Sequence, residues 1–114
     1  MRKDKALLQD VLDGINAIES FVKGKNKEEF FENDLIQSAV VRKLEIIGEA
    51  VKNLSKESKK NHSKVPWKDI AGMRDKLIHA YFGINLERVW ETINYSLPKF
   101  KDEITNILSE MKDA

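Results

Sequence analysis

Residues 34–54, DLIQSAVVRKLEIIGEAVKNL, predict a long helix with apolar side chains on two sides. These apolar residues recur at the spacing of a helical face. The main stripe consists of Ile36, Val40, Leu44, Ile47, Val51 and Leu54, and it is widened by Leu35, Ala39, Ile46 and Ala50. Because little polar surface remains, we expect other helices to pack on both sides. Gly48, in the middle, costs about 1 kcal/mol relative to Ala, which a close helix crossing would explain.

Two shorter segments precede this helix. Asp4 can cap a first helix with apolar residues at helical spacing, which should stop near Gly24. Residues 28–32 add a short helical turn. Asn33 or Asp34 is then placed to cap the long helix.

Two further helices are predicted after the long one. Pro66 suits the first turn of a third helix that ends near Gly83. Asn85 can cap a fourth helix, which Pro98 must kink or split because proline has no N–H to donate. We find no strand pattern and no internal repeat. The sequence therefore predicts an all-α fold, an antiparallel up-and-down bundle of four main helices in a single domain spanning residues 1–114.

The composition limits the possible classes of protein. A chain of 114 residues, 41% of them apolar, is long enough for one compact domain and is not typical of disorder. Apolar runs stay well short of the roughly 20 residues that span a bilayer, so we expect a soluble, cytoplasmic protein. Cysteine is absent, which excludes disulfides, thiolate zinc sites and cysteine nucleophiles. The two histidines have no second ligand nearby in the sequence, so no metal site is expected.

Residues 73–82, MRDKLIHAYF, place several chemically active side chains in one apolar pattern. The Arg74 guanidinium can grip a phosphate, and the His79 imidazole can move protons near neutral pH. Tyr81 adds a phenol. On a helix, Asp75 would lie on the same side as His79, four residues away, and could orient its ring. We take Arg74 and His79 as candidate catalytic residues for phosphodiester cleavage, with Asp75 in a supporting role.

A straight helix would separate the two candidate catalytic residues. Arg74 and His79 would lie about 140° apart around the axis and about 7.5 Å apart along it. Ile78 and Phe82 would form an exposed apolar face beside them, which a second copy of the same helix could bury. We therefore predict a homodimer with a composite site. Two copies of the pair can supply a base, an acid and a cation for RNA cleavage without a metal.

The formal net charge of +1 gives no basic field over the whole molecule. One cluster of lysines precedes the motif, and a charge run of this kind is most often a solvated connector. The cluster leads directly into residues 73–82, so Lys59, Lys60 and Lys64 are possible RNA contacts.

Three further stretches lie in register with the Arg-x4-His-x-Tyr motif of Arg74, His79 and Tyr81. They are residues 42–51 (RKLEIIGEAV), 65–73 (VPWKDIAGM) and 86–92 (LERVWET). With these four blocks in order, the chain resembles the HepT-like toxins of the HEPN superfamily, which belong to toxin–antitoxin pairs of the MntA/HepT type. The resemblance covers nearly the whole chain.

This resemblance implies a HEPN-like helical bundle and a homodimeric, metal-independent endoribonuclease. Arg74 and His79 would be its catalytic residues, and tRNA is the expected substrate. It also implies that Tyr81 is modified with AMP by a cognate nucleotidyltransferase antitoxin of the MntA type, which uses ATP. The ribonuclease itself is expected to need no cofactor.

Two other interpretations remain open from the residues alone. The chain could be a non-catalytic partner of a minimal nucleotidyltransferase that binds nucleotide or substrate, with Arg74 holding phosphate. It could also be a dimerisation module in which Arg74, Asp75 and His79 form an interface cluster. Glu45 and Glu49 are most simply members of ion pairs on their helix, with assistance to catalysis as the alternative. The four matching blocks favour the ribonuclease.

Overall fold

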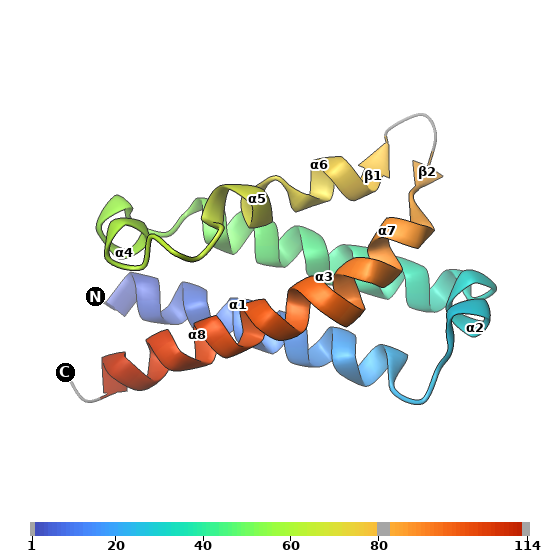
Figure 1. The fold of residues 1–114 in the computed structure, drawn as a ribbon, viewed down its shortest axis with the longest axis horizontal. Helices are drawn as coiled ribbons and strands as arrows, with labels where there is room; N and C mark the ends of the chain where they lie inside the picture. The colour runs from blue at the N-terminus through green and yellow to red at the C-terminus, as the bar shows by residue number, and fades with distance from the viewer. Residues whose placement is uncertain (1, 80–82, 113–114) are drawn as a thin grey trace.

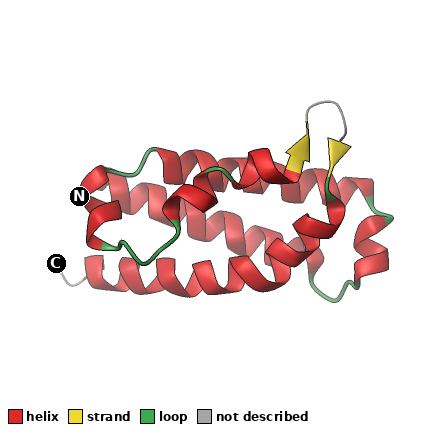
Figure 2. Cartoon of the chain, turned by 45° about the horizontal axis from the view of Figure 1, so that its top comes forward, coloured by secondary structure: helices red, strands yellow, loops and turns green. Residues whose placement is uncertain are grey.

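The computed structural model describes residues 2–79 and 83–112, apart from the side chains of Arg2, Arg74, Ile78, His79 and Lys112. It is an antiparallel helical bundle in which the longest helices lie side by side (Figures 1 and 2). The helices are α1 (Arg2–Val22), α2 (Lys27–Phe31), α3 (Asp34–Lys52), α4 (Lys56–Asn61), α5 (Trp67–Ala71), α6 (Met73–Leu77), α7 (Leu86–Glu91), the π-helix η1 (Thr92–Ser96) and α8 (Leu97–Lys112). Two short strands, β1 (Ile78–His79) and β2 (Gly83–Ile84), join α6 to α7.

The chain runs up and down the long axis of the bundle. Helix α3 returns beside α1, α5 and α6 run back along α3, and α7, η1 and α8 return along the bundle (Figure 1). The short helices α2 and α4 lie at opposite ends (Figure 1). The predicted all-α up-and-down bundle is therefore confirmed.

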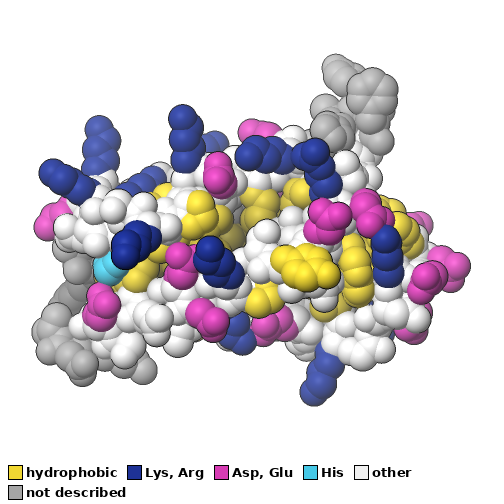
Figure 3. Space-filling model, viewed as in Figure 1, with side chains coloured by type: hydrophobic (Ala, Val, Ile, Leu, Met, Phe, Trp, Pro, Cys, Tyr) yellow, Lys and Arg dark blue, Asp and Glu magenta, His cyan; other side chains and the backbone are white. Residues whose placement is uncertain are grey.

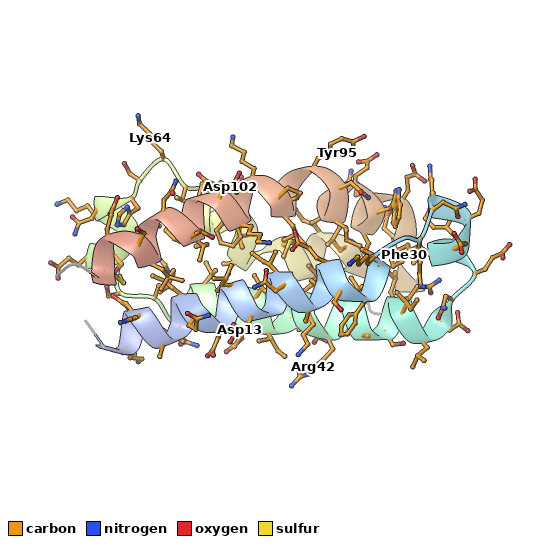
Figure 4. The ribbon with its side chains drawn as sticks, turned by 90° about the horizontal axis from the view of Figure 1, so that it is seen from below. Asp13, Phe30, Arg42, Lys64, Tyr95 and Asp102 are labelled. Atoms are coloured by element: carbon orange, nitrogen blue, oxygen red, sulfur yellow. The ribbon has the colours of Figure 1, made fainter. Side chains whose placement is uncertain are left out.

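The core lies between the apolar faces of α1, α3 and the segment from α7 to α8. Its fully buried side chains include Leu8, Val11, Ile15, Ile18, Phe30, Val40, Leu44, Ile47, Val51, Val89 and Ile104. Phe30 of α2 points into the bundle, where its ring centroid lies 5.3 Å from that of Trp90 (Figure 4). Leu35 is an exception to the predicted stripe, since it is 80% exposed near the start of α3.

Two glycines allow close helix crossings on two faces of α3. A Cβ atom on Gly14 of α1 would lie 2.9 Å from Cγ1 of Ile47. A Cβ atom on Gly48 would lie 3.4 Å from the carbonyl oxygen of Ala71, at the end of α5. The close crossing predicted at Gly48 is thus confirmed, and α5 is the helix that crosses there.

Asp4 does not cap α1 as predicted, because this helix already begins at Arg2. The Asp4 carboxylate is buried and accepts hydrogen bonds from the Ser55 amide (3.0 Å), the Ser55 hydroxyl (2.6 Å) and the Ser58 hydroxyl (2.6 Å). Burial alone would raise the pKa of Asp4, but these hydrogen bonds outweigh it and lower the pKa below its ordinary value. Asp4 therefore ties the start of α1 to the start of α4.

Helix α4 was not predicted from the sequence, and it occupies part of the lysine cluster. Ser55 caps it by accepting a hydrogen bond from the Ser58 amide over 3.1 Å. Pro66 precedes the next helix as its N-cap residue rather than lying in its first turn. By contrast, the caps predicted at Asn33 and Asn85 are confirmed.

The single third helix predicted from Pro66 to Gly83 is wrong. Helix α5 ends at Ala71 with Gly72 as its C-cap, α6 continues only to Leu77, and β1 pairs antiparallel with β2. The Leu77 carbonyl accepts the Asn85 amide over 2.8 Å, which closes this hairpin. Gly83 has a φ of +81°, a conformation that glycine adopts without a side-chain penalty.

The fourth helix is interrupted next to Pro98, as predicted. The interruption is the π-helix η1, in which the Leu97 amide donates to the carbonyl of Thr92, and Pro98 then lies in the first turn of α8. Proline has no N–H to donate. It fits there because η1 has already changed the regular pattern of backbone hydrogen bonds. Within the described residues, no helix is both long and apolar enough to cross a membrane.

Candidate active site

The Arg-x4-His-x-Tyr motif spans a junction between a helix and a hairpin. Arg74 is the second residue of α6, and His79 is the second residue of β1. Met73 and Leu77 anchor α6 in the core, being 8% and 3% exposed. Between these two anchors, Asp75 and Lys76 are exposed. The burial of the two anchors thus fixes which part of α6 is available to solvent.

The hairpin holds the backbone of His79. In the antiparallel register, Ile78 lies opposite Ile84 and His79 lies opposite Gly83. The hydrogen bond from Asn85 to Leu77 continues this pairing into the ends of the two flanking helices. The structure therefore brings Arg74 and His79 into one short segment at the edge of the bundle (Figures 1 and 2). Tyr81, Phe82 and Ala80 lie outside the described residues.

The helical geometry predicted for the motif is wrong, because His79 does not lie on α6. The expected separation of 140° between Arg74 and His79 applied to a straight helix and no longer holds. For the same reason, Asp75 and His79 are not a four-residue pair on one helical face. Asp75 is exposed on α6, whereas His79 lies on β1. Helix periodicity therefore does not place the carboxylate beside the imidazole.

Glu45 and Glu49 both belong to α3. They line a hollow of about 470 Å³ between α1 and α3, together with Asp10, Arg42 and Asn53. Glu45 is half-buried and Glu49 is exposed. This hollow is a feature of the α1–α3 face.

A groove that the sequence analysis missed runs beside α6. It has a volume of about 650 Å³ and separates α5 and α6 from the segment of η1 and α8. Its floor is apolar and includes Ile70, Met73, Leu77, Leu97 and Phe100, while charged residues of both signs, Asp69, Lys76, Arg88, Glu91, Lys99 and Glu103, line it as well. Tyr95 of η1 is 76% exposed at this groove and points away from the bundle (Figure 4). The sequence signal for this exposed tyrosine was that Tyr95 does not belong to the apolar stripe predicted for the fourth helix.

The possible RNA contacts lie at the α4 end of the molecule. Lys59 and Lys60 belong to the last turn of α4, and Lys64 is exposed in the following loop. His62 ends α4, and its Nε2 atom lies 3.9 Å from Oε2 of Glu110 on α8. His62 is therefore a half-buried neighbour of α8.

Comparisons with known proteins identify the family of this chain. The family model described as "Ribonuclease HepT-like" matches residues 11–107. The chain is 47% identical to the "Putative RNase" of Caldanaerobacter subterraneus subsp. tengcongensis, covering 98% of this chain and 100% of that protein. It is 41% identical to the "Probable ribonuclease HepT" of Thermococcus cleftensis, covering 93% and 96% of the two chains.

A further relative carries a second named activity. The chain is 45% identical to the "Gamma-glutamylcyclotransferase and putative RNase" of Methanocaldococcus jannaschii, covering 97% of this chain and 50% of that protein. No solved structure matches the chain significantly. The family model and the relatives agree on one activity. The chain belongs to the HepT-like ribonuclease family of the HEPN type.

Proposed function

We propose that this ribonuclease is the cytoplasmic toxin of a toxin–antitoxin pair and that it cuts tRNA without a metal ion, using Arg74 and His79. The observation that carries the proposal is the placement of both residues in one short segment, at the junction of α6 and β1. Family membership supplies the reaction class, and the motif supplies the groups that this reaction needs.

The chemistry follows from these two side chains. The 2′-hydroxyl attacks the adjacent phosphorus while a neutral imidazole takes its proton. The bond from phosphorus to the 5′-oxygen breaks, and an imidazolium gives that oxygen a proton. The products are a 2′,3′-cyclic phosphate and a 5′-hydroxyl. The Arg74 guanidinium stabilises the negative charge that develops on the phosphoryl oxygens.

A homodimer would supply the second imidazole. The reaction needs a base and an acid in the same turnover, and the chain has two histidines in all. His62 ends α4 and faces Glu110 of α8, in a different part of the fold from the motif. A second copy of His79 from a partner protomer would complete the site, and a twofold axis would place two copies of Arg74 there as well.

We further propose that Tyr81 is the site of silencing. It follows His79 by two residues, so an adenylyl group on its phenol would bring a phosphate charge and a nucleoside beside the motif. That charge would repel the RNA backbone, and the added bulk would occupy the approach to the site. The modifying enzyme would be a nucleotidyltransferase antitoxin of the MntA type that uses ATP.

A mixing experiment tests the composite site. Arg74→Ala and His79→Ala proteins should each fail to cleave tRNA in EDTA. If the site needs His79 from both protomers, mixing wild-type protein with His79→Ala protein under exchange conditions should lower the activity as the square of the wild-type fraction, with 2′,3′-cyclic phosphate ends on the products. Activity that falls only in proportion to the wild-type fraction, in a mixture shown to contain mixed dimers, would refute the shared site.

The silencing proposal has its own test. Intact mass of wild-type protein incubated with the antitoxin and ATP should increase by adenylyl groups, and cleavage should fall in parallel. Tyr81→Phe should gain no adenylyl mass at this site and should remain active in the same incubation. Modification of the phenylalanine variant to the same extent would assign the modification to another residue.

A further inference from the structure

The lysine cluster gives this chain a strong local charge that its net charge conceals. Residues 52–68 contain six lysines, Lys52, Lys56, Lys59, Lys60, Lys64 and Lys68, against one acidic residue, Glu57. This segment therefore has a formal charge of +5, while the whole chain has +1. The remainder of the molecule is acidic overall, so the charge is divided between two regions rather than mixed evenly. We call these six residues the lysine tract.

The fold displays the tract on the surface. It starts at the end of α3, continues through α4 and its following loop, and ends in α5. Lys52, Lys56, Lys60, Lys64 and Lys68 are exposed, and Lys59 is half-buried. The Asp4 carboxylate and the two serines beneath it fix the start of α4, so the tract rests on a buried hydrogen-bonded support. This support distinguishes it from a loose connector.

The acidic residues of α8 mark one boundary of the tract. Glu103 and Glu110 line a small hollow together with His62 and Lys64. On the other side, Lys and Arg side chains gather around α4 and continue, interspersed with acidic side chains, along the edge formed by α5 and α6 (Figure 3). A polyanion attracted to the tract would therefore lie along α4 and α5 rather than across α8.

The tract and the motif share this edge of the molecule. The order α4, α5, α6 and β1 runs from one end of the bundle towards the other, along a long axis of 45 Å (Figure 1). Gly48 lets α5 pack closely on α3, which holds this edge against the bundle. The tract is thus a separate surface that leads towards the cleavage motif.

We propose that the lysine tract is a second RNA-binding surface that holds phosphates of the substrate away from the bond that is cut. The location of that bond rests on the proposed function, whereas binding at the tract can be measured without cleavage. The ligand is the backbone of a folded RNA that is long enough to reach both α4 and the motif. Lysines suit this role because an ammonium group binds phosphate as a point charge without reading sequence.

Substrate size follows from this arrangement. An RNA that extends from the motif to α4 releases counterions when the lysines neutralise its phosphates, and this release strengthens binding. A dinucleotide at the motif reaches none of these lysines. The tract therefore selects extended or folded RNA over short fragments.

The binding test uses fluorescence anisotropy with end-labelled tRNA and protein carrying His79→Ala, so that no cleavage intervenes. In this background, the triple change Lys59→Gln, Lys60→Gln and Lys64→Gln should weaken binding. It should also reduce the slope of log K against log salt by about 2–3, since each phosphate contact contributes roughly 0.7–0.9. The matched control removes the same charge elsewhere through Lys23→Gln, Lys25→Gln and Lys43→Gln, and should keep the parent slope.

An activity test separates the tract from the motif. With an otherwise wild-type protein, the tract variant should lose a larger factor in kcat/KM on tRNA than on a dinucleotide. Equal salt slopes for the tract variant and the control variant would overturn the proposal. A tract variant that bound a protein partner less well would not rescue it, because the proposed ligand is RNA. Loss of cleavage by His79→Ala together with an unchanged slope would leave the proposed function intact and remove only the tract.

Discussion

The backbone amide of Asn85 donates to the carbonyl oxygen of Leu77 over 2.8 Å, which joins the last residue of α6 to the N-cap residue of α7. The Asn85 side chain also accepts the Arg88 amide over 3.1 Å and so caps α7. This hydrogen bond holds Leu77 and Asn85 together, and His79 and Tyr81 lie between these two residues in the sequence. A single asparagine thus links the motif hairpin to the fourth helix.

Replacing this cap should weaken the hairpin. Asn85→Ala should lower the free energy of unfolding by about 1 kcal/mol, because the Arg88 amide loses its acceptor. Asn85→Asp keeps an acceptor and should retain most of the stability. Urea denaturation gives the stability, and tRNA cleavage at a temperature where both variants are folded should show a larger loss for Asn85→Ala. Equal stability of the two variants would contradict the capping role.

Two glycines with similar backbone angles provide a matched test of the hairpin. Gly83 has a φ of +81° and Gly24 has a φ of +74°, and an added Cβ would meet no atom within 4 Å at either site. Gly83→Ala and Gly24→Ala should therefore each lower the free energy of unfolding by about 1–2 kcal/mol. Only Gly83→Ala should also reduce RNA cleavage, since Gly24 lies in the turn between α1 and α2. Equal cleavage by the two folded variants would show that hairpin geometry is unimportant.

The buried carboxylate of Asp4 should make the stability depend on pH. Its pKa is lowered in the folded state, so its contribution is present above its unfolded pKa and is lost as pH falls through the lowered folded pKa. At neutral pH, Asp4→Asn should lower the free energy of unfolding by roughly 1–3 kcal/mol, because an amide group cannot accept all three hydrogen bonds. The gap between wild type and variant should close on acidification.

Exposed Asp102 serves as the control for this measurement (Figure 4). Asp102→Asn should change the stability by no more than about 0.5 kcal/mol at any of these pH values. Thermal or urea unfolding followed from neutral to acidic pH would check both variants. A gap between wild type and Asp4→Asn that stays constant with pH would contradict the assigned cause.

The crossing of α3 and α5 should tolerate little added volume. Gly48→Leu places a side chain against the Ala71 carbonyl and should lower the free energy of unfolding by about 1–3 kcal/mol. Ser38→Leu, at an exposed site on the same helix, should remain within about 0.5 kcal/mol of wild type. Circular dichroism during urea denaturation distinguishes these outcomes. A Gly48→Leu protein as stable as wild type would mean that α3 and α5 can move apart without loss of stability.

Local sequence patterns predicted most of the bundle because its long helices depend on local rules. The apolar spacing of α3 and the caps at Asn33 and Asn85 involve residues within a few positions of one another. Helix α4 was missed because its residues, KESKKN, carry no apolar stripe. The role of Asp4 was misassigned because its partners, Ser55 and Ser58, lie more than 50 residues away.

The motif residues were identified from the sequence, but their local structure was not. Ile78 and Phe82 continue the helical apolar spacing, so periodicity alone favours a longer α6. The pairing of Ile78 with Ile84, and the positive φ of Gly83, are what end the helix instead. The groove at Tyr95 could not be predicted either, because it forms between α6 and η1, which are distant in sequence.

The most direct test of this account is the initial rate of tRNA cleavage in EDTA by wild-type protein, free of any adenylyl adduct, and by His79→Ala protein with the same circular dichroism spectrum. Removing a general acid–base group should lower the rate by roughly a hundredfold or more. Cleavage by wild type that resists EDTA and is lost in His79→Ala would agree with the account. Equal rates for the two proteins, or wild-type cleavage that EDTA abolishes, would contradict it.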